Sequence, residues 1–506
     1  MLVWFRSLPL FVVLVWISAG AMLFPAAMAF LTEDFATGRR FFYASLMTMI
    51  AATLIGIATQ GSRVVATERR QLVTLVASYL VLPVVLAIPM EQAVSATRFI
   101  NVYLDMVSAL TTTGAVVFEP GRLPDAVHLW RGTVGWLGGL LIWVSAMAVL
   151  APLSLGGYEV TSEARVEEGR IQTSLTQTGA SGAADRLRKS AAQLTPVYGV
   201  LTVALAFALL MAGETPLVAV IHAMSTMATS GITPVDGLIG RPAGVAGEAM
   251  ILIFFVFALS RRTFSRRFDR DWPGRIAADR EVRLAAFAVV VLPTLLFTRH
   301  WLGALEVATV ANFEDALAAL WGGAFTVLSF LTTTGFVSDS WVAARTWSGL
   351  ETPGLLLVGL VLMGGGVATT AGGLKLLRVY ALYKHGVREM GKLIHPNSVG
   401  GAGRLGRRIR REGAYIAWIF FMLFILSLAA VMLALAATGL GFEQALILSI
   451  SALSTTGPLA AVAGEAPIDY ITLSDAAKLI LAVAMIVGRI ETLVLIALLN
   501  PAFWRS

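Results

Sequence analysis

Four short segments of the chain share one arrangement of hydroxyl residues and a glycine. Each has a serine six positions before the glycine, a threonine two positions before it and a hydroxyl residue directly before it. Hydroxyls and backbone carbonyls are uncharged oxygen ligands, the kind that replace the water shell of an alkali cation. The segments are SALTTTGA from Ser108, STMATSGI from Ser225, SFLTTTGF from Ser329 and SALSTTGP from Ser451.

We predict that these four turns form one cation-binding filter. Glycine permits positive φ, so successive carbonyls can point to one axis, and a helix that ends at each turn would aim its negative end at the ion. A single Thr-Gly pair is more simply a helix stop or a polar contact between membrane helices, but four copies at equivalent places favour the filter. The predicted filter residues are Thr112, Thr113, Gly114, Thr229, Ser230, Gly231, Thr333, Thr334, Gly335, Thr455, Thr456 and Gly457.

The composition places these turns in a membrane protein. Of 506 residues, 57% are hydrophobic and 14% are charged, whereas a soluble domain has about 25% charged residues. Soluble enzymes and disordered chains are therefore excluded. The chain has no cysteine, and its five histidines have no metal-ligand spacing, so we expect no cofactor and no enzymatic activity.

Ten apolar spans are expected. The first two, Leu8 to Leu31 and Phe41 to Gln60, form an N-terminal pair, and the first is too long for the core of a signal peptide. The others lie near 71–90, 131–153, 194–213, 245–260, 283–299, 352–383, 413–437 and 475–499.

Between the members of each later pair lies a half-polar segment of about 12 to 16 residues, too short to cross a core of roughly 30 Å. We interpret these segments as re-entrant half-helices. The predicted fold is an all-α polytopic membrane protein with four helix, re-entrant pore loop, helix repeats around one pore. The predicted division is 1–62 for a two-helix unit, then 63–156, 157–270, 271–400 and 401–506 for the four repeats.

Basic residues predict the orientation. The loops after spans two, four, six and eight, together with Arg6 and Arg505, hold 28 of the 38 Lys and Arg residues. The positive-inside rule then places both termini in the cytoplasm, and the half-helices enter from outside. The outer segments carry many acids, among them Asp105, Glu214 and Glu443, which would concentrate cations at the mouth. Alternatively, exposed loops simply need charge.

The span 352–383 is interrupted by GGGVATTAGG, residues 364–373. Each glycine costs about 1 kcal/mol relative to alanine in a helix, so the span should break into two halves joined by a loop below the filter. A glycine-rich surface for close helix packing is the alternative. The predicted loop residues are Gly364, Gly365, Gly366, Thr369, Thr370, Gly372 and Gly373.

Two basic residues, Lys375 and Arg489, fall within or beside apolar spans. A cation at the bilayer centre costs about 2.5 to 3.5 kcal/mol, so each should face the pore, an acid or the interface. The alternatives are that Lys375 extends to the cytoplasm and that Arg489 pairs with Glu491 or Glu443.

GAGRLG at 401–406 follows no strand and is not a dinucleotide site. The basic segments 261–283 and 404–411 could bind an acidic partner or anionic membrane lipid, and no nucleic acid is expected.

Several longer motifs accompany the turns, and in combination they are specific. They are WLGGLLIW from Trp136, TTTGFVSDSW from Thr332, GGGVATTAGGLKLLRVY from Gly364, IHPN from Ile394 and GRIETLVLIALLNPAFW from Gly488. With these motifs the chain resembles the TrkH/TrkG/KtrB superfamily of K⁺ transporters over nearly its whole length. The N-terminal pair of spans looks like the TrkH branch.

The resemblance implies K⁺ uptake across the cytoplasmic membrane, with K⁺ bound by the hydroxyl residues of the turns. It further implies a gate at 364–373, Arg489 projecting into the cavity as a barrier to ions, a homodimer and a cytosolic ring of nucleotide-binding TrkA-type subunits. Plant relatives that carry Na⁺ have Ser in place of the first filter glycine, so Gly114 favours K⁺. A Na⁺ or unselective cation pathway and a non-conducting sensor or scaffold are the alternatives. Whether transport is passive or a symport with H⁺ or Na⁺ is left open.

Overall fold

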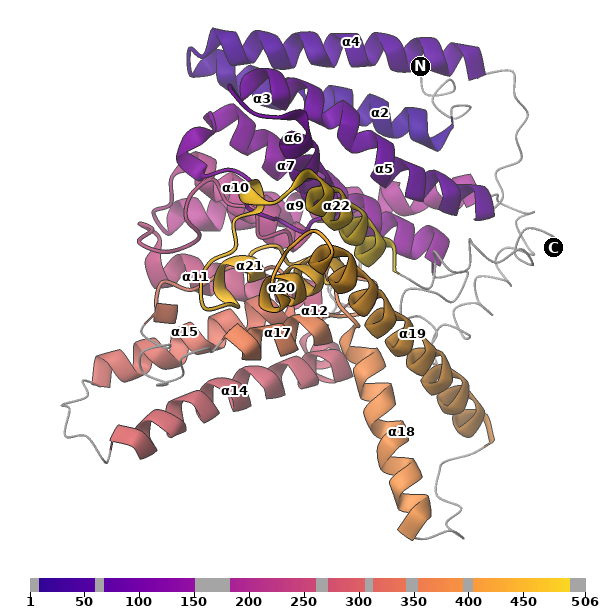
Figure 1. Cartoon of the computed structure of the whole chain (residues 1–506), viewed down its shortest axis with the longest axis vertical. Coiled ribbons are helices and arrows are strands. Elements are labelled where there is room, and N and C mark those ends of the chain that lie inside the picture. Colours follow the sequence, from indigo (N-terminus) through magenta and orange to yellow (C-terminus); the bar gives the residue numbers. More distant parts are fainter. Residues whose placement is uncertain are drawn as a thin grey trace.

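The computed structural model of the chain is a bundle of helices (Figure 1). It describes residues 9–59, 68–150, 183–260, 272–304, 313–342, 354–394 and 404–491. Within these ranges the chain forms helices and turns without strands, which confirms the predicted all-α class. Outside them lie the ends of the first two predicted spans, residues 261–271 of the basic segment 261–283, part of the 401–406 motif, the IHPN motif after Ile394 and the chain after Glu491.

Seven helices among the described residues are long and apolar enough to cross a membrane. Three predicted spans are not among them. The span 245–260 forms only a short apolar helix from Gly244 to Leu259, the span 352–383 is broken, and the last is described only as far as Glu491. The seven are Leu10–Leu31, Phe35–Thr59, Gln71–Ala93, Asp125–Leu150, Asp185–Met211, Arg280–Thr298 and Gly413–Ala436.

The N-terminal helices lie along one edge of the molecule (Figure 1). Helices α2 (Leu10–Ala21) and α3 (Leu23–Leu31) form one apolar stretch, and α4 (Phe35–Thr59) runs back beside them. The Ser45 hydroxyl of α4 donates to the Ala19 carbonyl of α2 at 2.7 Å. Small residues at this contact let the two backbones approach each other closely.

The rest of the described chain repeats one order of elements: a long helix, a short helix, a turn and a second helix. The first unit consists of α5 (Glu68–Ala93), α6 (Phe99–Leu110), the short η1 (Pro120–Arg122), α7 (Asp125–Ser145) and a π-helical turn η2 (Ala146–Leu150). The second unit consists of α9 (Ala183–Met211), α10 (Pro216–Ala228), α11 (Gly244–Phe254) and α12 (Val256–Leu259).

The third and fourth units follow the same order. The third consists of α13 (Trp272–Ala277), α14 (Arg280–Ala304), α15 (Phe313–Leu331), α17 (Gly354–Met363) and α18 (Leu376–Ile394). The fourth consists of α19 (Arg404–Ala436), α20 (Phe442–Leu453), α21 (Leu459–Val462), η5 (Tyr470–Thr472) and α22 (Asp475–Ile490).

The short helices are the elements that position the turns. Helices α6, α10 and α20 have 12, 13 and 12 residues, within the predicted length. Helix α15 has 19, longer than the expected limit of about 16. Its first turns read FEDALAAL, which is rich in strong helix formers and extends the helix. The domain boundaries given above remain a prediction.

Candidate cation filter and gate loop

Each short helix ends in the same backbone turn. In each, an N–H bonds to the carbonyl five residues back, and the N–H before it bonds to the carbonyl three residues back. This pair of bonds is the Schellman ending of a helix. The five-residue bonds are Thr113 to Ser108 at 2.8 Å, and Ser230 to Ser225, Thr334 to Ser329 and Thr456 to Ser451, each at 2.9 Å.

The left-handed residue of each ending is a threonine, where glycine is usual. The φ angles are 54° at Thr112, 52° at Thr229, 57° at Thr333 and 53° at Thr455. Positive φ in a β-branched residue is a genuine outlier, and such strain costs of order 1–3 kcal/mol for each residue. The same strained threonine in all four turns indicates that the site needs a side chain there. The sequence pattern predicted positive φ at the glycines but did not predict it at the threonines.

The filter glycines allow neighbouring turns to touch. Gly114, Gly231 and Gly335 have φ of 68°, 67° and 85°, as predicted, but Gly457 does not have positive φ. Pro458 follows Gly457 and helix α21 begins directly after it, which turns the chain in a different direction. The expectation of positive φ at all four glycines is therefore wrong for the fourth.

The four turns form a closed ring. A Cβ atom added at Gly114, Gly231 or Gly457 would overlap a neighbouring turn, and one added at Gly335 would make a tight contact with the fourth turn, so that the fourth turn returns to the first. The Gly457 N–H also donates to the Thr113 carbonyl, which closes the circle. The contacts are Gly114 with the Ser230 carbonyl, Gly231 with the Thr334 carbonyl, Gly335 with Pro458, and Gly457 with Ala115.

All eight predicted hydroxyl ligands are at least 99% buried, and no charged side chain is among the twelve filter residues. At the strained position, the hydroxyls of Thr112 and Thr455 have no hydrogen-bond partner in the described part of the chain. The Thr229 hydroxyl donates to the adjacent Ala228 carbonyl at 2.7 Å. Buried hydroxyls are normally satisfied, so two of them left without partners fit a site where a cation supplies the missing interaction.

The predicted break in the span 352–383 is present. Helix α17 ends at Met363 and α18 begins at Leu376, and every residue from 364 to 375 is buried or nearly buried without being helical. The loop is fixed to neighbouring helices: the Gly366 N–H donates to Ala258 at 3.0 Å and the Val367 N–H donates to Glu281 at 2.8 Å. These hydrogen bonds belong to a folded loop. They are not those of a glycine-rich packing surface between two continuous helices, which was the alternative.

The loop also contacts the filter. The Gly372 N–H donates to the Thr333 hydroxyl at 2.7 Å, and the Thr370 hydroxyl donates to the Met227 carbonyl at 3.2 Å. A Cβ at Gly372 would overlap the Ser454 carbonyl and the Thr455 hydroxyl. The loop therefore touches the third and fourth turns and the last residues of α10, which lead into the second turn.

The two predicted basic residues meet at the loop. Lys375 and Arg489 are both buried; Lys375 donates to the Ala371 carbonyl and Arg489 donates to the Thr370 carbonyl at 2.7 Å. Lys375 thus does not extend to the surface in this conformation. The Nε and Nη2 atoms of Arg489 have no hydrogen-bond partner in the described part of the chain.

Glu491 pairs with Arg378, which sequence analysis did not select. The Nη2 atom of Arg378 lies 2.8 Å from the Glu491 carboxylate, and its guanidinium group lies 3.6 Å from the centre of the Phe420 ring. Glu443 instead accepts the Glu465 N–H. In these contacts Arg489 therefore pairs with neither Glu491 nor Glu443, which was the alternative prediction.

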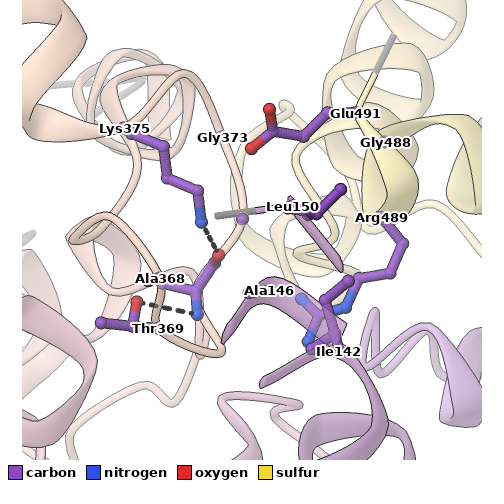
Figure 2. Close-up of a pocket in the computed structure, with 12 residues that line it drawn as sticks. Ile142, Ala146, Leu150, Ala368, Thr369, Gly373, Lys375, Gly488, Arg489 and Glu491 are labelled. Atoms are coloured by element: carbon purple, nitrogen blue, oxygen red, sulfur yellow. Dashed lines mark hydrogen bonds between the residues drawn. The ribbon is translucent and has the colours of Figure 1, made fainter. Parts of the chain in front are cut away.

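A small cavity of about 30 Å³ lies beside the loop (Figure 2), enough for about one water molecule. Figure 2 shows Lys375 and Arg489 on opposite sides of it, one from the loop and one from α22. Ile142 and Ala146, at the π-helical end of α7, line a third side. Glu491 also lines the cavity but is paired with Arg378, so a cation that passes the loop would meet the positive charges of Lys375 and Arg489 here.

Some acids predicted for the mouth have structural partners. Asp105 is buried and bonds to Arg131 at 2.9 Å. Glu214 forms an ion pair with Arg241. Burial would raise the pKa of Glu214, but hydrogen bonds from Arg241 and from the Thr215 N–H outweigh it and hold the pKa below its usual value. These two acids therefore brace the structure and are not free to attract ions.

Together, the apolar helices and the ring of four uncharged turns are typical of a membrane protein for ion transport. Residues 276–505 match the sequence profile of TrkH, described as a cation transport protein. The chain is 30% identical to the Trk system potassium uptake protein TrkH of Salmonella typhimurium over 97% of this chain and 98% of that one. It is 32% identical to TrkH of Halomonas elongata over 79% of this chain and 78% of that one.

The crystal structure of the potassium transporter TrkH from Vibrio parahaemolyticus has the same fold, with a TM-score of 0.81 and 26% identity over 99% of this chain and 100% of that one. The chain belongs to the TrkH family. The recognition made from the sequence is therefore confirmed, as is the assignment to transport and not to enzymatic catalysis. Among the described residues, no group of three His, Cys, Asp or Glu side chains could hold a metal ion.

Proposed function

We propose that the chain takes up K⁺ across the cytoplasmic membrane through the ring of four turns. The observation that carries this proposal is the ring itself, in which four strained threonines lie at equivalent positions and two have hydroxyls without a hydrogen-bond partner among the described residues. Carbonyl and hydroxyl oxygens in such a ring replace the hydration shell of the ion. The relatives named potassium uptake proteins support K⁺ as the ion.

The loop 364–373 is the gate in this proposal. Its bonds to Met227 and Thr333 support this role, because they hold the loop against α10 and the third turn, and Lys375 and Arg489 add positive charge at the neighbouring cavity. In the closed state the loop blocks the path, and the two cations raise the electrostatic barrier to K⁺. Displacement of the loop breaks its bonds to the filter and removes the Thr370 partner of Arg489.

The partners and the orientation are part of the same proposal. Both termini and the basic loops face the cytoplasm, where a nucleotide-binding ring of the TrkA type controls the gate. Two copies of the chain form a homodimer, each with its own pore. The name of the relatives as members of a Trk system supports a multi-component assembly. Co-purification of the chain with such a ring, and its loss in high salt, would test the docking to the basic loops.

Ion flux into liposomes that hold the purified chain tests the transport proposal. The comparison is K⁺ with Na⁺, for the unaltered chain and for Gly335→Ser. We expect K⁺ flux to exceed Na⁺ flux and the substitution to weaken the preference, because Gly335 has positive φ and packs on Pro458. Equal flux of both ions would support an unselective pathway. No flux, even with a cytosolic partner added, would support a sensor or scaffold.

A binding measurement distinguishes a filter that does not bind K⁺ from one that binds K⁺ but is closed by the gate. An ion that binds the folded state raises the unfolding free energy by RT ln(1 + [L]/Kd). We expect K⁺ to raise the unfolding temperature more than Na⁺ does at equal ionic strength. Equal stabilisation by both ions would contradict a K⁺-selective filter.

A further inference from the structure

A buried carboxylate stands behind the third turn of the filter. Glu248 lies in α11, a helix of the second unit that is otherwise apolar, and its exposure is 2%. Nothing in the transport proposal uses this residue. A buried carboxyl group must be compensated by hydrogen-bond donors, because its desolvation is costly.

All three donors to Glu248 come from the third unit. Its Oε2 atom accepts from the Trp321 indole N–H at 2.6 Å and from the Ser338 hydroxyl at 2.8 Å. Its Oε1 atom accepts from the Asp339 backbone N–H at 2.7 Å. Trp321 belongs to the short helix α15 that precedes the turn, and Ser338 and Asp339 follow Gly335 by three and four residues. Glu248 therefore joins the middle of the helix that leads into the third turn to the segment that follows the turn.

The connection runs in both directions. The Asp339 carboxylate accepts the Gly240 N–H of the second unit at 2.9 Å. At the filter itself, Gly231 packs against the Thr334 carbonyl. The second and third turns are thus joined at the ring and again behind it, and Glu248 makes most of the second connection.

The equivalent residue of the first unit does something different. Arg131 and Glu248 each lie 17 residues after the filter glycine of their unit. Arg131 bonds to Asp105 on the short helix of its own unit. Of the two, Glu248 is the one that reaches into a neighbouring unit.

We propose that Glu248 is a positioning residue that sets the geometry of the third filter turn and, through it, the discrimination between K⁺ and Na⁺. This inference rests on the proposed transport function. A strained residue such as Thr333 keeps its conformation only when its surroundings fix it from several sides. Carbonyl and hydroxyl ligands distinguish K⁺ from Na⁺ by their positions and number. A turn released at its back would adjust to the smaller ion.

The test is the ratio of K⁺ to Na⁺ flux in liposomes for Glu248→Gln. A glutamine has one oxygen, so at least one of the three donors loses its acceptor whichever way the amide turns. We expect the ratio to fall about threefold to tenfold, the equivalent of about one hydrogen bond. The ratio does not depend on how much protein is folded, so a merely structural role would lower both fluxes and leave it unchanged.

Two further variants complete the test. Ser338→Ala removes one donor and keeps the carboxylate; we expect a smaller fall of the ratio, and no additional effect of similar size when it is combined with Glu248→Gln. Asp185→Asn is the control, because among the described residues this exposed carboxylate of α9 pairs only with Arg188 of the same helix at 3.8 Å and should leave the ratio unchanged.

The outcomes are distinct. An unchanged ratio in folded Glu248→Gln and Ser338→Ala proteins, with a selective unaltered chain, overturns the role of Glu248 and leaves the transport function intact. If Glu248→Gln does not fold, the ratio in Ser338→Ala decides the question. If the unaltered chain carries both ions equally, the proposed function fails and the role of Glu248 fails with it.

Discussion

The backbone N–H of Gly372 donates a 2.7 Å hydrogen bond to the hydroxyl of Thr333. Both residues are buried. Thr333 is one of the four strained threonines of the ring, so this hydroxyl serves the loop when the loop is in place. Under the proposed function, the same hydroxyl becomes available to an ion when the loop moves away. In the proposed mechanism, the hydroxyl oxygen of Thr333 therefore belongs to both the gate contact and the filter.

Thr333→Val should loosen the loop. Valine keeps the shape of threonine but leaves the buried Gly372 N–H without an acceptor, at a cost of about 1–3 kcal/mol. The chain has no cysteine, so Val367→Cys provides a single labelling site in the loop. We expect the thiol to react faster in the Thr333→Val background. Thr333→Ser, which keeps the hydroxyl, is the control, and equal labelling rates in all three would contradict the coupling.

Thr455→Gly should remove ion binding with little loss of fold stability. Glycine relieves the strain at φ 53°, of order 1–3 kcal/mol, which offsets its larger unfolded-state entropy of about 0.4–1 kcal/mol. The substitution removes a hydroxyl that has no hydrogen-bond partner within the ranges that the structure describes. We expect the unfolding temperature without K⁺ to change little and the K⁺-dependent increase to shrink. Thr455→Ser should retain that increase. A full K⁺ response in the glycine variant would show that this hydroxyl is not a ligand.

Gly231→Ala should disrupt the ring. The methyl group would overlap the Thr334 carbonyl, and the residue has φ of 67°. Gly237→Ala is a matched control, because Gly237 has φ of 72° and no atom within 4 Å of an added Cβ. The control should cost only the backbone strain, about 1–2 kcal/mol. We expect a larger drop in unfolding temperature and loss of flux for Gly231→Ala alone; equal effects would assign the cost to φ and not to the contact.

Arg378→Met should destabilise the protein by about 3–5 kcal/mol, because it leaves the buried Glu491 carboxylate without its partner. The exposed pair of Arg188 and Asp185, 3.8 Å apart, provides the comparison. Arg188→Met should cost less than about 1 kcal/mol. Thermal unfolding in detergent measures both. Similar small effects would mean that Arg378 contributes little at the end of α22.

Glu214 predicts a dependence of stability on acid. Its pKa is lowered in the folded state from the ordinary value of 4.5, so its contribution is fully present above that value. The contribution is lost as the pH falls through the lower folded pKa. We expect Glu214→Gln to reduce the unfolding temperature at pH 7 and to flatten its fall below pH 5. Parallel curves for the two proteins would remove Glu214 from the acid response.

The sequence was sufficient for features that are local. The Ser and Thr pattern located the four turns, and the glycine content of 364–373 predicted the break between α17 and α18, because helix propensity is a property of neighbouring residues. The left-handed threonines were missed because propensity alone assigns positive φ to glycine. There the tertiary contacts of the ring override the local preference.

The contacts of single charged residues could not be predicted. Glu248 bonds to residues 73 to 91 positions away, and Arg378 pairs with Glu491 over 113 positions. No spacing rule connects such residues. The sequence did allow a simpler prediction. Glu248 is an isolated acid in the apolar helix α11, and Arg378 is a further basic residue close to Lys375, so each should have a buried partner.

The ring closes within a single polypeptide, and its four turns are not identical. In a pore assembled from four equal subunits, one substitution changes all quadrants at once. Here one codon alters one quadrant and leaves the other three in place. Selection can therefore change one of the four turns at a time. The divergent sequences TSGIT at Thr229 and TTGPL at Thr455 beside the matching turns at Thr112 and Thr333 are the kind of record that such stepwise adjustment leaves.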